Sequence, residues 1–131
     1  MTAGVATTDR SRGAALADFD NDGRLDLVVM NRRAPMELYR NITEGTGHWL
    51  TIALQQRGGN RNAVGAQVTV QAGGISQMQQ ITVGGGHAGG KALPLHFGIG
   101  NAPAAAIHIL WPDGSEDLYQ GMPNTALTFS R

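Results

Sequence analysis

The acidic stretch Asp18-Phe19-Asp20-Asn21-Asp22-Gly23-Arg24-Leu25-Asp26 decides how the first part of the chain folds. Carboxylates occupy positions one, three, five and nine of this loop, and the glycine at position six allows the positive φ of a sharp bend. Calcium takes about six to eight oxygen ligands, and this spacing turns alternate side chains toward one centre. The sequence therefore predicts a structural Ca²⁺ site made by four carboxylates and one carbonyl: Asp18, Asp20, Asp22, Asp26 and the backbone carbonyl of Arg24.

Three other interpretations of this loop are open. A solvated acidic turn needs no ion, but it leaves the carboxylates to repel one another. Magnesium prefers a small octahedral shell that keeps several waters. An EF-hand needs a glutamate at position twelve, where Val29 stands, and strand-forming residues replace its helices here. A structural calcium ion without a sensor role is therefore the favoured interpretation.

Strand-forming residues surround the loop. Residues 14–19 and 25–31 predict a hairpin with the loop at its turn, and residues 36–41 predict a third strand. Apolar side chains on both faces of residues 25–31 indicate a strand that lies between two layers. The polar, glycine-bearing segment 42–47 then predicts a domain boundary.

The rest of the chain also predicts strands. Its 131 residues include 19 glycines, above the usual share of about 7%, and these glycines are spread over turn-like places. Long stretches with apolar residues at helical spacing are absent from the sequence, so we expect an all-β chain. Seven further strands at the spacing of a sandwich or barrel are expected over residues 49–55, 66–72, 77–83, 93–98, 105–111, 116–119 and 126–129.

The loop and its flanks resemble the FG-GAP/VCBS repeat family, whose members carry Asp-x-Asp-x-Asp-Gly-x-x-Asp between two strands of a β-propeller blade. Residues 13–27 fit this pattern throughout, and residues 36–41, Met-Glu-Leu-Tyr-Arg-Asn, match the following strand of the family. The resemblance implies that residues 1–46 form a partial β-propeller-type blade, which is a hairpin with a calcium loop. It also implies the same five metal ligands as the spacing does.

Residues 47–131 resemble the ASPIC/UnbV domain, and we expect them to form an antiparallel β-sandwich. The matching pieces are His48-Trp49-Leu50, Asn62-Ala63-Val64-Gly65-Ala66-Gln67-Val68, Gly84-Gly85-Gly86, Leu95-His96-Phe97-Gly98-Ile99-Gly100 and Ile109-Leu110-Trp111-Pro112-Asp113-Gly114. After the glycine run the family usually has an aromatic residue and Ser-Gln, whereas this chain has His87-Ala88-Gly89-Gly90-Lys91. The resemblance implies a place outside the cell, a role in adhesion or protein interaction, and no catalytic site.

Other residues that could carry chemistry favour structural interpretations. Trp49 and Trp111 lie in apolar strands and are interpreted as buried anchors, although exposed tryptophans would stack on sugars. Asn41-Ile42-Thr43 is a glycosylation sequon, which matters only if the source glycosylates exported proteins. Histidines that lack metal-ligand spacing are His48, His87, His96 and His108. Arginines interpreted as solvated basic clusters are Arg10, Arg12, Arg32 and Arg33.

Composition limits the partners. Ten basic and ten acidic residues balance, so we expect no nucleic-acid partner. The absence of cysteine excludes disulfides and thiolate chemistry. Apolar runs are too short to span a bilayer, and residues 1–12 lack a signal-peptide core, so we expect any export signal to lie outside this chain.

These observations favour a non-catalytic, calcium-stabilised module at the cell surface or outside the cell. It is expected to act in adhesion, interaction or self-assembly, with a protein partner or other copies of the same chain. The alternative is a carbohydrate-binding accessory domain of a larger exported protein, with a glycan as ligand. An enzyme ranks third, because no serine, histidine or glycine-rich segment stands in a catalytic context.

Overall fold

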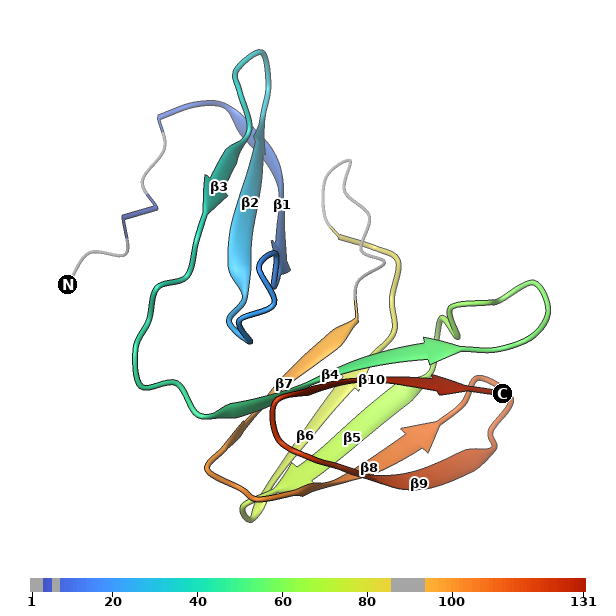
Figure 1. Ribbon diagram of the computed structural model, residues 1–131. Helices are drawn as coiled ribbons and strands as arrows, with labels where there is room; N and C mark the ends of the chain where they lie inside the picture. Colours follow the sequence, from blue (N-terminus) through green and yellow to red (C-terminus); the bar gives the residue numbers. More distant parts are fainter. Residues whose placement is uncertain (1–3, 6–7, 86–93) are drawn as a thin grey trace. The chain divides into compact units, whose positions relative to one another are not determined.

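The computed structural model describes residues 4–5, 8–85 and 94–131, and these residues form strands, turns and loops without a helix (Figure 1). The chain divides into two compact units, one built on residues up to Glu44 and one built on Gly45–Val83 with the chain from residue 94 onward. We call them the acidic-loop unit and the sandwich unit. The strands of the described residues are β1 (Ser11–Ala17), β2 (Asp26–Asn31), β3 (Glu37–Tyr39), β4 (His48–Gln55), β5 (Gln67–Ala72), β6 (Ile75–Gln80), β7 (Leu95–Gly100), β8 (Ala105–Leu110), β9 (Glu116–Gly121) and β10 (Thr125–Ser130).

The acidic-loop unit is one antiparallel sheet in the order β1-β2-β3. Leu27 of the central strand pairs with Leu16 on one side and with Tyr39 on the other. Because β1 and β2 are joined in a hairpin, the acidic loop over residues 18–25 lies at one end of the sheet. The turn between β2 and β3 lies at the opposite end (Figure 1).

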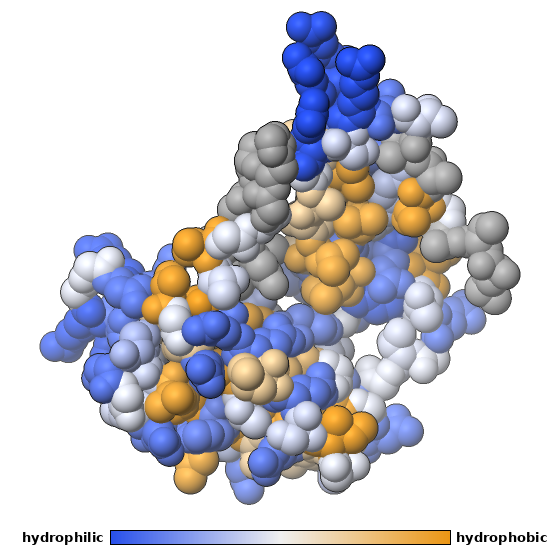
Figure 2. All heavy atoms as spheres, turned by 180° about the vertical axis from the view of Figure 1, so that it is seen from behind, coloured by the Kyte–Doolittle hydropathy of each residue, from blue (hydrophilic) through white to orange (hydrophobic). Residues whose placement is uncertain are grey.

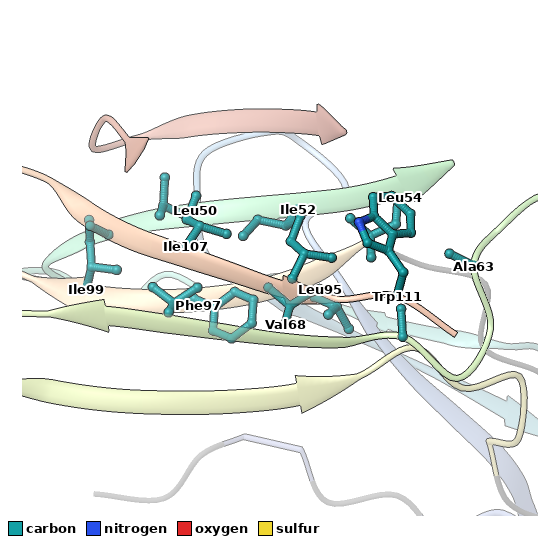
Figure 3. Close-up of a cluster of buried hydrophobic side chains, with 14 residues drawn as sticks. Leu50, Ile52, Leu54, Ala63, Val68, Leu95, Phe97, Ile99, Ile107 and Trp111 are labelled. Atoms are coloured by element: carbon teal, nitrogen blue, oxygen red, sulfur yellow. The ribbon is translucent and has the colours of Figure 1, made fainter. Parts of the chain in front are cut away.

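The sandwich unit packs two sheets face to face. One has the order β10-β4-β7 and the other has the order β6-β5-β8-β9. Alternate residues of β4, β5, β7 and β8 point inward, as the period of two in a strand requires. Figure 3 shows these side chains meeting between the layers, where the largest are Phe97 of β7 and Trp111, the residue that follows β8. Burial of this apolar surface is the main stabilising contribution to the unit.

The edges of the two sheets are joined by side chains. The Nε2 atoms of Gln77 and Gln79, on β6, donate hydrogen bonds to the carbonyl oxygens of Gly98 and His96, on β7, each at 2.6 Å. On β9 and β10, the rings of Tyr119 and Phe129 stack with centroids 4.1 Å apart. These contacts close both sides of the sandwich, because β6 and β7 lie at one side and β9 and β10 at the other.

The all-β prediction is confirmed, and each strand expected from the sequence overlaps an observed one. One strand pair differs from the expected antiparallel arrangement, because β10 runs parallel to β4. The short turn after Gly121 carries the chain from the outer strand of one sheet to the outer strand of the other, and this crossing sets the direction of β10. The strand expected over residues 77–83 begins earlier, at Ile75, because Gly73 and Gly74 turn the chain with positive φ values of 56° and 80°.

Two backbone segments approach each other so closely at position 47 that only glycine fits there. A Cβ atom on Gly47 would lie 2.7 Å from the Cα atom and the carbonyl oxygen of Gly100. We predict that Gly47→Ala lowers the free energy of unfolding by about 1–3 kcal/mol, since backbone must move to relieve the clash. Gly59→Ala is the matched control, because a Cβ atom there meets no atom within 4 Å. Equal denaturation midpoints for the two variants would contradict this prediction.

Candidate metal centre

The loop between β1 and β2 curls around the carboxylate of Asp18. Its Oδ1 atom accepts the backbone N–H of Asp22 at 3.0 Å, and its Oδ2 atom accepts the N–H of Gly23 at 2.8 Å. Gly23 has a φ of 86° and Asn21 a φ of 58°, so the bend uses the left-handed region twice. Glycine enters that region without steric cost and asparagine enters it more readily than most residues, which explains their places in the loop.

Three of the predicted ligands come together. Asp18, Asp20 and Asp22 each offer a carboxylate oxygen, and these oxygens all lie within 4.8 Å of one another. Two oxygens on opposite sides of a calcium ion lie about 4.6–5.2 Å apart, given bond lengths of about 2.3–2.6 Å. The spacing and the hard oxygen donors therefore fit a calcium ion. The donor set would hold the ion by charge and would stiffen the loop.

The fourth predicted carboxylate, Asp26, has a different set of contacts. It is 2% exposed, and its Oδ2 atom accepts the N–H of Phe19 at 3.2 Å while its Oδ1 atom accepts the N–H of Asn41 at 2.7 Å. Within the described residues it does not belong to the group of three carboxylates. Asp26 therefore fastens the loop to the chain after β3. Arg24 lies beside the group, since its backbone N–H donates to Asp22 at 2.9 Å.

Two arginines neutralise part of the acidic charge. The Nε atom of Arg40 donates to Asp20 at 2.7 Å, and its Nη2 atom lies 3.5 Å from Asp22. The guanidinium of Arg24 also contacts Asp22, and its Nε atom donates to the carbonyl of Asn41 at 2.8 Å. The hydrogen bond to Asp20 raises the pKa of Arg40 above its ordinary value, which favours the charged guanidinium.

The sequence pattern named Arg24 only for its backbone carbonyl, and it assigned no role to the side chain of Arg24 or to Arg40. A bound cation was expected as the simple way to remove the repulsion between the carboxylates, and the chain also supplies two cations itself. The signal for Arg40 was present in the predicted third strand. Because β3 runs antiparallel to β2, the residue that follows Tyr39 returns to the end of the sheet that carries the loop.

The other candidate residues have structural contacts. Trp111 is 2% exposed and its Nε1 atom donates to Asp117 at 2.7 Å, which confirms a buried anchor. Trp49 is half-buried and stacks on His96, with ring centroids 6.1 Å apart. His108 lies 3.0 Å from Glu116. His87, and the departure from the family pattern around it, lie outside the described residues.

Asn41, the sequon asparagine, holds the loop as well. Its Oδ1 atom accepts hydrogen bonds from the N–H and the hydroxyl of Thr43, at 3.1 and 2.7 Å. Its Nδ2 atom, to which a glycan would be attached, donates to the carbonyl of Leu25 at 3.2 Å. The arrangement gives Asn41 a structural role at the end of β3.

The fold and the loop define an all-β protein in which a hairpin with an acidic loop precedes a β-sandwich. The model of the family described as ASPIC and UnbV matches residues 56–130, more than half of the chain. The chain belongs to the ASPIC and UnbV family, as the resemblance of residues 47–131 implied.

The curated relatives extend this similarity toward the acidic loop. The chain is 30% identical over 127 residues to cartilage acidic protein 1 of Homo sapiens. The alignment covers 90% of this chain and 19% of the relative. It is 31% identical over 111 residues to the protein of the same name from Mus musculus, with 80% of this chain and 17% of the relative covered. The chain thus spans less than a fifth of the length of these relatives. Among the described residues, no helix has the length and apolar character to cross a membrane.

Asp26 provides a test of how the loop holds together without metal. We predict that, in excess chelator, Asp26→Asn destabilises the acidic-loop unit by about 1–3 kcal/mol, because an amide cannot accept both backbone N–H groups through oxygen. Asp20→Asn should cost less than about 1 kcal/mol, because it loses only an exposed ion pair. Hydrogen exchange of the β2 amides measures both effects. Faster exchange in Asp20→Asn than in Asp26→Asn would reverse the assignment.

Proposed function

We propose that this chain is a non-catalytic interaction module that works outside the cell and is stabilised by calcium. The observation that carries the proposal is the group of carboxylate oxygens from Asp18, Asp20 and Asp22, within 4.8 Å of one another. Millimolar calcium outside the cell suits weak sites of this kind, because extracellular calcium modules have dissociation constants of about 10⁻⁴–10⁻³ M. The two neighbouring guanidinium groups favour such a weak site, since they reduce its net negative charge.

In this proposal calcium has a structural task. It draws the three carboxylates to one point and removes their repulsion, while Asp26 keeps the loop fastened to the chain after β3. The acidic-loop unit is then a blade of the FG-GAP/VCBS type. Two observations support this blade assignment. The unit is a three-stranded antiparallel sheet with the acidic loop between its first two strands, and residues 13–27 follow the sequence pattern of the repeat.

Exposed apolar side chains support an interaction role for the acidic-loop unit. Leu16 is 53% exposed on one face of the sheet, and Leu38 and Met30 are 56% and 52% exposed on the other. Figure 2 shows hydrophobic side chains over the body of this unit. Apolar surface on both faces of a sheet favours burial between neighbouring layers. We propose other copies of the chain as the neighbours.

A carbohydrate-binding role based on aromatic stacking has less support. Trp111 is buried in the sandwich and Trp49 is half-buried against His96, so neither ring offers an open platform to a sugar.

Calcium should raise the melting temperature of the chain by several degrees at millimolar concentration, because the ion binds only the folded loop. Asp20→Asn should abolish most of this rise, since it removes one of the clustered carboxylates. Glu44→Gln, an exposed carboxylate outside the cluster, is the matched control and should keep the full rise. Scanning calorimetry in calcium and in chelator measures all three proteins. Identical curves for the unaltered chain in the two buffers would remove calcium from the proposal.

The chain should also self-associate as its concentration rises. Leu38→Ser is expected to weaken association roughly tenfold, because it removes an exposed apolar side chain from the sheet of the acidic-loop unit. Leu118→Ser serves as control, since Leu118 is 79% exposed on the sandwich unit. Sedimentation equilibrium with and without chelator gives the association constants. A strictly monomeric chain, or equal weakening by the two substitutions, would contradict the proposed contact.

A further inference from the structure

A second charged feature lies at the end of the acidic-loop unit opposite the acidic loop. The backbone N–H of Arg32 donates to the carbonyl of Arg10 at 2.9 Å, which extends the pairing of β1 with β2 by one step. This bond places the segment before β1 beside the turn after β2. Figure 2 shows strongly hydrophilic side chains gathered at this tip.

An open hollow of about 300 Å³ lies between these two segments. Its lining residues are Thr8, Asp9, Arg10, Arg32, Arg33 and Ala34. Arg33 has a φ of 59°, a left-handed conformation that is uncommon for a residue with a side chain.

The hollow has an excess of positive charge. Among the described residues that line it, three are arginines and one, Asp9, is acidic, although the chain as a whole is neutral. The arginines of the acidic loop are paired with carboxylates. In contrast, the ion pairs found among the described residues do not include Arg10, Arg32 or Arg33. All three are exposed, so their guanidinium groups are accessible to a ligand.

We propose that this arginine hollow binds the sulfate or carboxylate groups of an acidic polysaccharide. A guanidinium presents a planar fork of donors that matches such oxyanions in a bidentate way, and lysine does not. The hollow is open, which suits a charged group carried on an extended chain better than a small molecule that must be enclosed.

Other polyanions match the hollow less well. Single-stranded nucleic acid is held by aromatic side chains that stack on its bases, and none of the described residues that line the hollow is aromatic. Duplex nucleic acid requires a longer basic surface, which a chain of balanced charge with three clustered arginines does not provide. The proposal is independent of the calcium site, because the two features use different residues at opposite ends of the sheet.

The test is calorimetric titration of the full chain with a short sulfated oligosaccharide at low salt. Arg32→Gln and Arg33→Gln are each expected to weaken binding roughly tenfold, since each removes a charge-assisted contact. Arg57→Gln removes one exposed positive charge from the sandwich unit and should change the affinity less than about twofold. Arg32→Lys keeps the charge but loses the fork, so an intermediate affinity supports bidentate contact.

Parallel titrations separate the possible sources of the anion. A non-sulfated polymer of uronic acid that binds with similar affinity supports a carboxylate ligand, and a clear preference for the sulfated sugar supports a sulfate ligand. Equal binding of poly-glutamate, or of inorganic sulfate or phosphate, would overturn the polysaccharide assignment in favour of a peptide or a small anion. If Arg57→Gln and Arg32→Gln lowered the affinity equally, or if neither sugar bound, the assignment of the binding site to the hollow would be wrong. Unchanged melting temperatures show that the variants are folded.

Discussion

The acidic-loop unit depends on one buried carboxylate. Asp26 is almost removed from water, and a buried carboxylate without hydrogen bonds would be very costly. Its partners are backbone N–H groups on Phe19 and Asn41, so the start of the loop and the end of β3 must stay in place together. This constraint brings Arg40 beside Asp20. The positions of both the candidate ligands and the internal cations therefore follow from the same hydrogen-bonded group.

The sandwich unit is stabilised in another way. Its large side chains interlock between two sheets, and at the edge of β7 the carbonyl oxygens of Gly98 and His96 accept hydrogen bonds from Gln77 and Gln79. Strand edges with satisfied hydrogen bonds resist pairing with other chains. The acidic-loop unit leaves Leu16 and Leu38 more than half exposed on its sheet, and the sandwich unit also exposes Leu118 at its surface. The two units thus differ in what holds them together: a buried apolar layer in the sandwich unit and hydrogen bonds to a buried carboxylate in the acidic-loop unit.

Local sequence patterns located the strands and the three clustered carboxylates, because period-two alternation and loop spacing act over short distances. The contacts that were missed act over longer ones. Arg40 reaches Asp20 only after β2 and β3 have paired, and Asp26 accepts an N–H from a residue well beyond its own strand. The direction of β10 was missed for the same reason, because a strand pattern has no polarity and the crossing between sheets sets it.

The parallel pair of β4 and β10 has a consequence for protein synthesis. β4 begins the sandwich unit and lies between β7 and β10 in its sheet. During translation β4 leaves the ribosome first and β10 last, so the central strand keeps one open edge until the end of the unit has emerged. The nascent chain is then exposed to mispairing and to chaperones at this edge. A premature stop before β10 would make this transient exposure permanent.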